Sequence, residues 1–244
     1  MSSALPPGWY TPEIKALTLP QLWRVAGGCT TFVVGVVFFK LLRLPTEPGV
    51  ALRYPTRLRR VGREDLPGAA AACFARLDED ARRLGLGPEG FTYLVSLRAK
   101  QAAAGAVWLA RDGTLFLHAL WADAPGHDRL AAVSLARAGA RERARQLVTT
   151  NLPRELSDGA LADVVRLERR ADAGQLVARH RERTGDVQRL DLAAVEEAVR
   201  VLNDDQLEEL VEQGVHVRLD DEVARKLPWP PPPLDAGLFD PPSA

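Results

Sequence analysis

The sequence predicts an α+β protein with an N-terminal single transmembrane helix, an antiparallel sheet covered by helices, and a C-terminal acidic helical segment. Three observations lead to this prediction. An uncharged apolar run spans residues 25–39. Alternating apolar stretches over residues 91–121 enclose an Asp-Gly turn, which is typical of a β-hairpin. Helical periodicity with end signals recurs at residues 67–85, 172–184 and 191–214.

Length and composition restrict the classes of protein. A chain of 244 residues has room for one domain with terminal appendages. Its formal net charge is zero, so no nucleic-acid partner is predicted. The two cysteines, Cys29 and Cys73, are too few for a disulfide framework or a cysteine-bound zinc. Charge is nevertheless uneven, because basic residues gather between Lys40 and Arg63 and acidic residues between Asp186 and Glu222.

The apolar run predicts a transmembrane helix over residues 22–44. Its uncharged part would cover roughly 22 Å of a hydrocarbon core about 30 Å thick. Long side chains at both ends can place their charges among the lipid headgroups, which extends the span to about 30 Å. An aromatic residue at the interface agrees with this arrangement. The residues expected to anchor the chain are Trp23, Arg24, Val33, Val36, Phe38 and Lys40.

The arginines that follow this run predict its orientation. Residues 1–21 carry almost no charge, whereas the next segment is basic, so the positive-inside rule predicts that the globular domain lies on the cytoplasmic side. The arginines would then be within reach of anionic lipids, with a solvated linker as the alternative. These residues are Arg53, Arg57, Arg59, Arg60 and Arg63.

The first elements of the domain have clear local signals. Asp65, Pro67 and helical spacing predict a helix over residues 67–85. Residues 91–98 alternate as a half-buried strand does. Strands at 105–110 and 114–121 flank Arg111-Asp112-Gly113. The predicted core stripe of the helix is Ala70, Phe74, Leu77, Ala81 and Leu84.

The second half of the domain has weaker local signals for secondary structure. Residues 130–143 have a helix-compatible composition, although an irregular or strand-helix passage is the alternative. Residues 146–151 and 162–169 predict two short strands. Residues 172–184 predict a helix. No alternating β-α units occur, so an antiparallel sheet is expected.

An acidic amphipathic helix is predicted over residues 191–214, with Asn203-Asp204-Asp205 expected to break it in two. Its acidic side chains suit a solvated face or a contact with the arginine cluster. Past Pro228 the chain is rich in proline and is expected to be extended or disordered. The predicted segments are the N-terminal segment 1–21, the transmembrane helix 22–44, the basic linker 45–64, the α+β domain 65–185, the acidic helical segment 186–227 and the Pro-rich tail 228–244.

Four stretches carry a resemblance to known proteins. The runs FTYLVSL, AVWLARDGTLFLHALWAD, LVTTNLPREL and GQLVARHRER fall within residues 91–183. Together they loosely resemble an uncharacterised group of bacterial membrane-associated proteins, in which a short membrane segment precedes a sheet domain. The resemblance implies membrane association and supplies no activity or catalytic residue.

Few residues suggest catalytic or metal chemistry. His118, Asp123 and His127 lie close in sequence, but zinc requires three ligands in a fixed geometry, and a strand histidine and a loop histidine are the simpler interpretation. His180 has no neighbouring nucleophile in the sequence. We therefore predict no catalytic, cofactor or metal site. Thr149 to Asn151 are expected to cap a turn.

The sequence favours a non-enzymatic module that binds membrane lipid and either a protein partner or a ligand, through its sheet or its acidic helix. Two alternatives remain open. One is a small enzyme with a dispersed site, in which His118 and His180 are the acid-base groups. The other is a wholly soluble α+β protein with residues 22–44 in its core.

Overall fold

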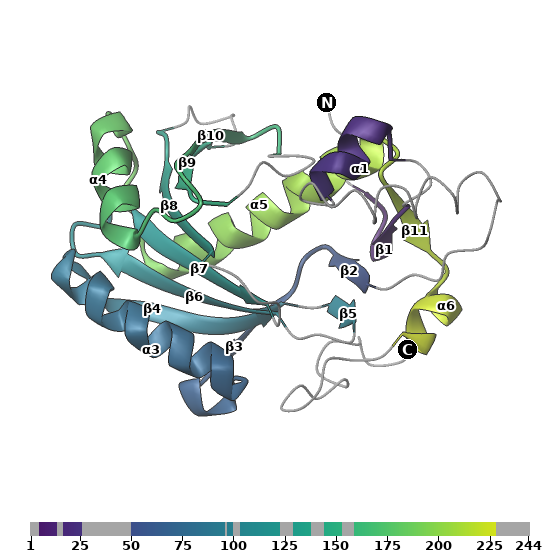
Figure 1. The fold of residues 1–244 in the computed structure, drawn as a ribbon, viewed down its shortest axis with the longest axis horizontal. Helices are drawn as coiled ribbons and strands as arrows, with labels where there is room; N and C mark the ends of the chain where they lie inside the picture. The colour runs from purple at the N-terminus through teal and green to yellow at the C-terminus, as the bar shows by residue number, and fades with distance from the viewer. Residues whose placement is uncertain are drawn as a thin grey trace.

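The computed structural model describes residues 5–13, 17–25, 50–95, 97–99, 103–122, 129–137, 144–152 and 159–227. Two sheets and several helices make up this part of the chain (Figure 1). The predicted α+β class is therefore confirmed.

The larger sheet has seven strands in the order β10-β9-β8-β7-β6-β4-β3. Its neighbours pair in antiparallel fashion, except that β9 and β10 are parallel. The sheet is thus mixed, and the prediction of an antiparallel sheet is wrong at that edge. The strands are β3 (Leu58–Val61), β4 (Leu86–Val95), β6 (Ala103–Ala110), β7 (Phe116–Ala122), β8 (Arg129–Leu135), β9 (Gln146–Thr150) and β10 (Ala162–Arg166).

A smaller sheet of four antiparallel strands lies beside the larger one, in the order β11-β1-β2-β5 (Figure 1). Its strands are β1 (Gly8–Pro12), β2 (Val50–Tyr54), β5 (Leu97–Ala99) and β11 (His216–Leu219). Two short helices, α1 (Leu19–Val25) and α6 (Asp221–Lys226), accompany it. Strands β2 and β3 both fall within residues 45–64, the segment expected to be a linker.

Two helices cover one face of the larger sheet, α3 (Gly68–Arg83) and α4 (Ala173–Arg183). Helix α3 buries Ala70, Phe74, Leu77 and Ala81, as its apolar spacing predicts. Helix α4 begins with a capping box, in which the Asp172 carboxylate accepts the Gln175 N–H at 2.9 Å and the Gln175 side chain accepts the Asp172 N–H at 3.0 Å. Both helices therefore lie within two residues of their predicted bounds, although Asp65 does not cap α3.

One long helix, α5 (Leu192–Glu212), covers the opposite face. Its N-terminal half packs Val195, Ala198 and Val199 into the apolar cluster of that face. The helix runs without interruption through Asn203-Asp204-Asp205, so the expected break is wrong. The reason is that the Asn203 amide donates to the Val199 carbonyl at 2.7 Å, which leaves the helix ladder intact, while both aspartates are held by other segments.

Strand β8 has no clear signal in the sequence because both faces of the larger sheet are buried there. Residues 130–143 were expected to be helix-compatible, but Arg129–Leu135 is strand β8. Leu130 and Ala132 belong to the cluster under α3 and α4, and Ala131 and Val133 to the cluster under α5. Because successive side chains enter two apolar layers, no polar alternation marks the strand.

The predicted transmembrane helix is not part of the described structure. Helix α1 has seven residues and ends at Val25, and among the described residues no helix combines the length and the apolarity needed to span a bilayer. This finding corrects the predicted fold class and the prediction of a membrane protein. The predicted span reached the thickness of a bilayer only when residues on both flanks were counted. Of the predicted anchor residues, Trp23 is exposed on α1 and Arg24 lies on α1, while Val33, Val36, Phe38 and Lys40 lie outside the described residues.

Gly105 gives a test of the packing between β4 and β6. It lies opposite Tyr93, and a Cβ at this position would overlap the buried Tyr93 ring. We expect Gly105→Ala to lower the free energy of unfolding by about 1–3 kcal/mol, measured by urea denaturation. Gly68→Ala is the control, because its Cβ would meet no atom and the substitution should be neutral or slightly stabilising. Equal stability of the two variants would contradict this packing.

Candidate functional site

A cavity of about 440 Å³ lies between α5, the ends of β8 and β9, and the end of β2. One stripe of α5 forms its longest wall, because residues three or four apart share a helix face. The residues that line it are Tyr54, Pro55, Leu135, Ala144, Gln146, Gln188, Ala194, Glu197, Ala198, Arg200, Val201, Asp204, Asp205 and Glu208.

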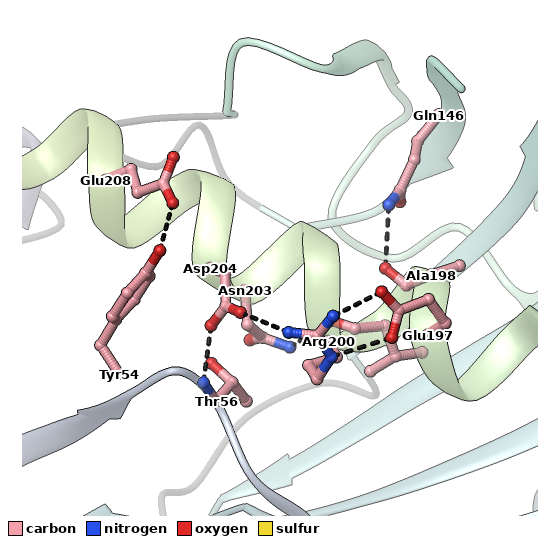
Figure 2. A network of polar contacts seen from close by, with 10 residues as sticks. Tyr54, Thr56, Gln146, Glu197, Ala198, Arg200, Asn203, Asp204 and Glu208 are labelled. Carbon is pink, nitrogen blue, oxygen red and sulfur yellow. Dashed lines mark hydrogen bonds and ion pairs between the residues drawn. The ribbon is translucent and has the colours of Figure 1, made fainter. Parts of the chain in front are cut away.

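The acidic groups on α5 hold the segment that connects the two sheets (Figure 2). The Tyr54 hydroxyl donates to Glu208 Oε1 at 2.5 Å. The backbone N–H of Thr56 donates to Asp204 Oδ1 at 2.6 Å. Arg200 Nη1 donates to the second oxygen of Asp204 at 3.0 Å and also pairs with Glu197. The carboxylates of Asp204 and Glu208 are therefore satisfied although both residues are buried.

Burial and neighbouring carboxylates shift the pKa values of two groups in this wall. Burial raises the pKa of Asp204 above its ordinary value, and the neighbouring Glu208 charge raises it further. Burial and the hydrogen bond to Glu208 raise the pKa of Tyr54 to about 12. Burial, the larger cause of both shifts, disfavours any unpaired charge, whereas the smaller contribution of the neighbouring carboxylates disfavours a further negative charge and favours a cation.

Gln146 carries the most informative polar atom of the cavity. The residue is 2% exposed, and its Nε2 donates to the Ala198 carbonyl at 2.8 Å (Figure 2). This bond fixes the amide orientation, because a flipped amide would place two acceptors against each other. Oε1 is buried and has no hydrogen-bond partner in the part of the chain that the structure describes. A buried acceptor left in this state costs about 1–3 kcal/mol.

The predicted lipid-contact arginines are spread over separate places. Arg53 lies over the Trp9 ring, with 5.3 Å between its guanidinium carbon and the ring centroid. Arg60 lies 4.4 Å from the Phe91 centroid, and its Nε donates to Glu196 on α5 at 2.7 Å. The latter bond is a contact between the arginine cluster and the acidic helix.

The remaining members of that cluster differ in exposure. Arg57 is exposed between β2 and β3, and Arg59 is partly buried on β3. Arg63 Nη2 donates to Asp78 at 2.6 Å. The structure does not gather the five side chains into one basic patch, and their contact with anionic lipid stays a prediction.

His118 lies on β7 and is buried, with 5% of its surface exposed. Its Nε2 lies 2.5 Å from the Tyr93 hydroxyl, and the two rings are stacked with centroids 5.9 Å apart. Burial lowers the pKa of His118 to about 4. Among the described residues no three potential metal ligands come together. Asp123 and His127 lie outside the described residues.

His180 is the centre of a buried chain of hydrogen bonds. Ser134 Oγ donates to the Thr114 carbonyl at 2.8 Å, so its oxygen must accept from His180 Nε2, also at 2.8 Å. His180 Nδ1 then accepts from Thr149 Oγ1 at 3.0 Å, and Thr149 accepts from Arg183 at 3.1 Å. Burial and the Arg183 charge lower the pKa of His180 to about 4. The chain therefore fixes one neutral tautomer.

The hydrogen bonds around His180 correct the statement that no nucleophile lies near it. The sequence shows no nucleophile near His180, yet folding places Ser134 against it. Both residues are fully buried and the Ser134 proton is already donated, so the pair serves packing. Thr150 caps a turn as expected, since its Oγ1 accepts the Leu152 N–H at 3.1 Å. Thr150 and Asn151 also bind both backbone groups of Leu130 at the start of β8.

Comparison with known proteins adds no function to this geometry. No protein-family description, characterised protein or solved structure matches the chain. The resemblance to bacterial membrane-associated proteins stays a prediction. The function is therefore argued from the cavity itself.

Sequence reasoning did not find the site residues Tyr54, Thr56 and Gln146. Tyr54 and Glu208 are 154 residues apart, and Thr56 and Asp204 are 148 apart. No local pattern can indicate such pairs. The available signal was the acidic helix, whose buried acids imply partners from elsewhere in the chain.

The buried histidines predict a loss of stability in mild acid. The pKa values of His118, His180 and His216 are each lowered to about 4 by burial. Between pH 6.5 and 4 the unfolded chain binds these protons and the folded chain does not, so stability is complete above pH 6.5 and falls below it. Urea unfolding across this range should show a loss on the order of 1–3 kcal/mol for each histidine.

His216→Leu is the matched variant for this experiment. His216 Nδ1 has no hydrogen-bond partner among the described residues, so leucine removes a titrating group without breaking a bond at that atom. The variant should lose less stability than the wild type between pH 6.5 and 4. An unchanged pH profile would show that His216 does not titrate with a lowered pKa.

The Tyr54–Glu208 bond can be tested by a double-mutant cycle. We expect Tyr54→Phe to destabilise the protein by about 1–3 kcal/mol, since it leaves a buried carboxylate without its donor. The same change should cost much less when Glu208 is already leucine. Additive effects in urea unfolding would mean that the two side chains are not coupled.

Proposed function

We propose that this protein is a non-enzymatic ligand-binding module, and that its cavity along α5 binds a small aliphatic amine in the protonated form. The unsatisfied Gln146 Oε1 is the observation that carries the proposal. It is an acceptor at a fixed position, so its complement is a hydrogen-bond donor. A protonated amine is a donor without acceptor lone pairs.

The charges of the lining support a cation. Four carboxylates, those of Glu197, Asp204, Asp205 and Glu208, face one guanidinium, that of Arg200. Arg200 is already paired with two of them. A ligand ammonium would reduce this excess, and its attraction to the buried carboxylates of Asp204, Asp205 and Glu208 would be screened less than attraction at an exposed surface.

The size and the apolar lining support an aliphatic ligand. A volume of about 440 Å³ lies within the usual range of small-molecule sites. Leu135, Ala144, Ala194, Ala198 and Val201 offer apolar surface beside the polar groups. The side chain of Glu197 is 57% exposed, whereas Gln146 is nearly inaccessible. The Glu197 side of the cavity is therefore the solvent-facing one, and the ammonium would reach Gln146 at the inner end.

Titration calorimetry with butylamine tests this proposal. We expect the wild type to bind butylamine and to bind butanol, its neutral counterpart, at least tenfold more weakly. Gln146→Leu should weaken butylamine binding about tenfold, which corresponds to one hydrogen bond. Gln213→Leu is the control, because it makes the same chemical change at an exposed residue at the end of α5.

A second pair of variants tests the charge argument. Glu197→Gln should weaken butylamine binding and leave butanol binding unchanged, whereas Glu212→Gln, an exposed change farther along α5, should alter neither. Equal binding of butylamine and butanol would overturn the proposed ligand class. Butylamine binding that is indifferent to Gln146→Leu would overturn the proposed site.

A further inference from the structure

A second concavity, of about 570 Å³, lies along β3, the edge strand of the larger sheet, and Arg60, which also contacts α5, is among its lining residues. It shares no lining residue with the cavity along α5. We refer to it as the β3 groove, and its polar lining residues are Arg59, Arg60, Arg63, Asp65, Asp78 and Thr92.

Arg63 is held in a fixed position beside this groove. It belongs to the 3-10 helix η1 (Arg63–Asp65) that follows β3. Its Nη2 donates to Asp78 Oδ1 at 2.6 Å, and the Trp108 indole N–H donates to the same oxygen at 2.6 Å. The guanidinium carbon also lies 5.6 Å from the centroid of Phe74. A guanidinium fixed in this way loses little freedom when it binds an anion.

Two donors of the β3 groove have no acceptor. Nη1 of Arg63 and Nη1 of Arg59 are both shielded from solvent, and neither has a hydrogen-bond partner among the described residues. Charged donors that are shielded and unsatisfied are unfavourable, so two of them at one groove point to an acceptor that the chain does not supply.

The acidic residues of the groove are already engaged. Asp78 accepts from Arg63 and Trp108, and Asp65 accepts the Gly62 N–H at 3.3 Å. Arg60 is directed away to Glu196. Three arginines and two aspartates line the groove. Because Arg60 is paired with Glu196 and Arg63 with Asp78, Arg59 is the arginine of this lining that has no acidic partner among the described residues.

We propose that the β3 groove binds a phosphoryl group, whose oxygens accept hydrogen bonds from Nη1 of Arg59 and Nη1 of Arg63. A phosphoryl group presents several acceptor oxygens around one centre, so it can engage two guanidinium groups at once. The group can belong to free phosphate or to a phosphomonoester. Binding would satisfy both donors and stabilise the loop from Val61 to Asp65.

Titration calorimetry at constant ionic strength tests the β3 groove, with inorganic phosphate and glycerol phosphate as separate probes. Arg59→Gln should weaken binding at least tenfold, while Arg57→Gln, an exposed change two residues earlier, should leave it unchanged. Preference for glycerol phosphate would assign the site to phosphomonoesters, and preference for inorganic phosphate to the free anion. Equal losses in both variants would mean diffuse attraction to positive charge and would overturn the proposal.

Thermal unfolding is the second measurement, and it distinguishes a variant that fails to bind phosphate from one that fails to fold. Arg59 Nη1 makes no hydrogen bond with any described residue, so Arg59→Gln breaks no bond at that atom and should fold with an unchanged or higher Tm. Phosphate should raise the Tm of the wild type and of Arg57→Gln, and should not raise that of Arg59→Gln. A phosphate-induced rise that is the same in all three proteins would overturn the assignment to this groove.

Discussion

The docking of α5 is the constraint on which the rest of the described structure depends. Its first half closes one apolar face of the larger sheet, through Val195, Ala198 and Val199. Its second half leaves that sheet and reaches the smaller one, where Leu207 packs with Tyr10 and Tyr54. A helix that serves two sheets must bridge the space between them, and the cavity along α5 lies where that bridge begins.

Polar groups are buried in this protein in two distinct ways. Around His180 every donor has an acceptor, from Arg183 through Thr149 and Ser134 to the Thr114 carbonyl. Such a complete chain stabilises one arrangement and leaves no capacity for a ligand. At Gln146 and at the β3 groove the accounting is incomplete, because shielded polar atoms lack partners. His216 Nδ1 is also buried without a partner among the described residues, so it is the adjoining cavity, together with the unpaired atom, that marks Gln146 and the β3 groove as candidate binding sites.

The sequence predicted those elements whose signals are local. The turn at Asp112-Gly113 and the bounds of α4 each depend on neighbouring residues, and both occur close to where they were expected. Strand β8 could not be predicted, because Leu130 and Ala131 enter opposite apolar layers and no alternation is visible. The acidic helix was recognised by composition, yet its role depends on Tyr54 and Thr56, which come from a distant segment expected to be a linker.

The topology also orders the assembly of the chain. Each strand of the larger sheet pairs with its neighbour along the sequence, apart from the passage of β5 into the smaller sheet. The smaller sheet instead joins β1 to β11, where the Arg218 side chain binds the Pro7 carbonyl across 211 residues. Contacts of such long range form late, since much chain must be synthesised and ordered first. The larger sheet can therefore begin to form before Glu208 has been synthesised, and the cavity along α5 can be completed only once α5 is present to contact Tyr54.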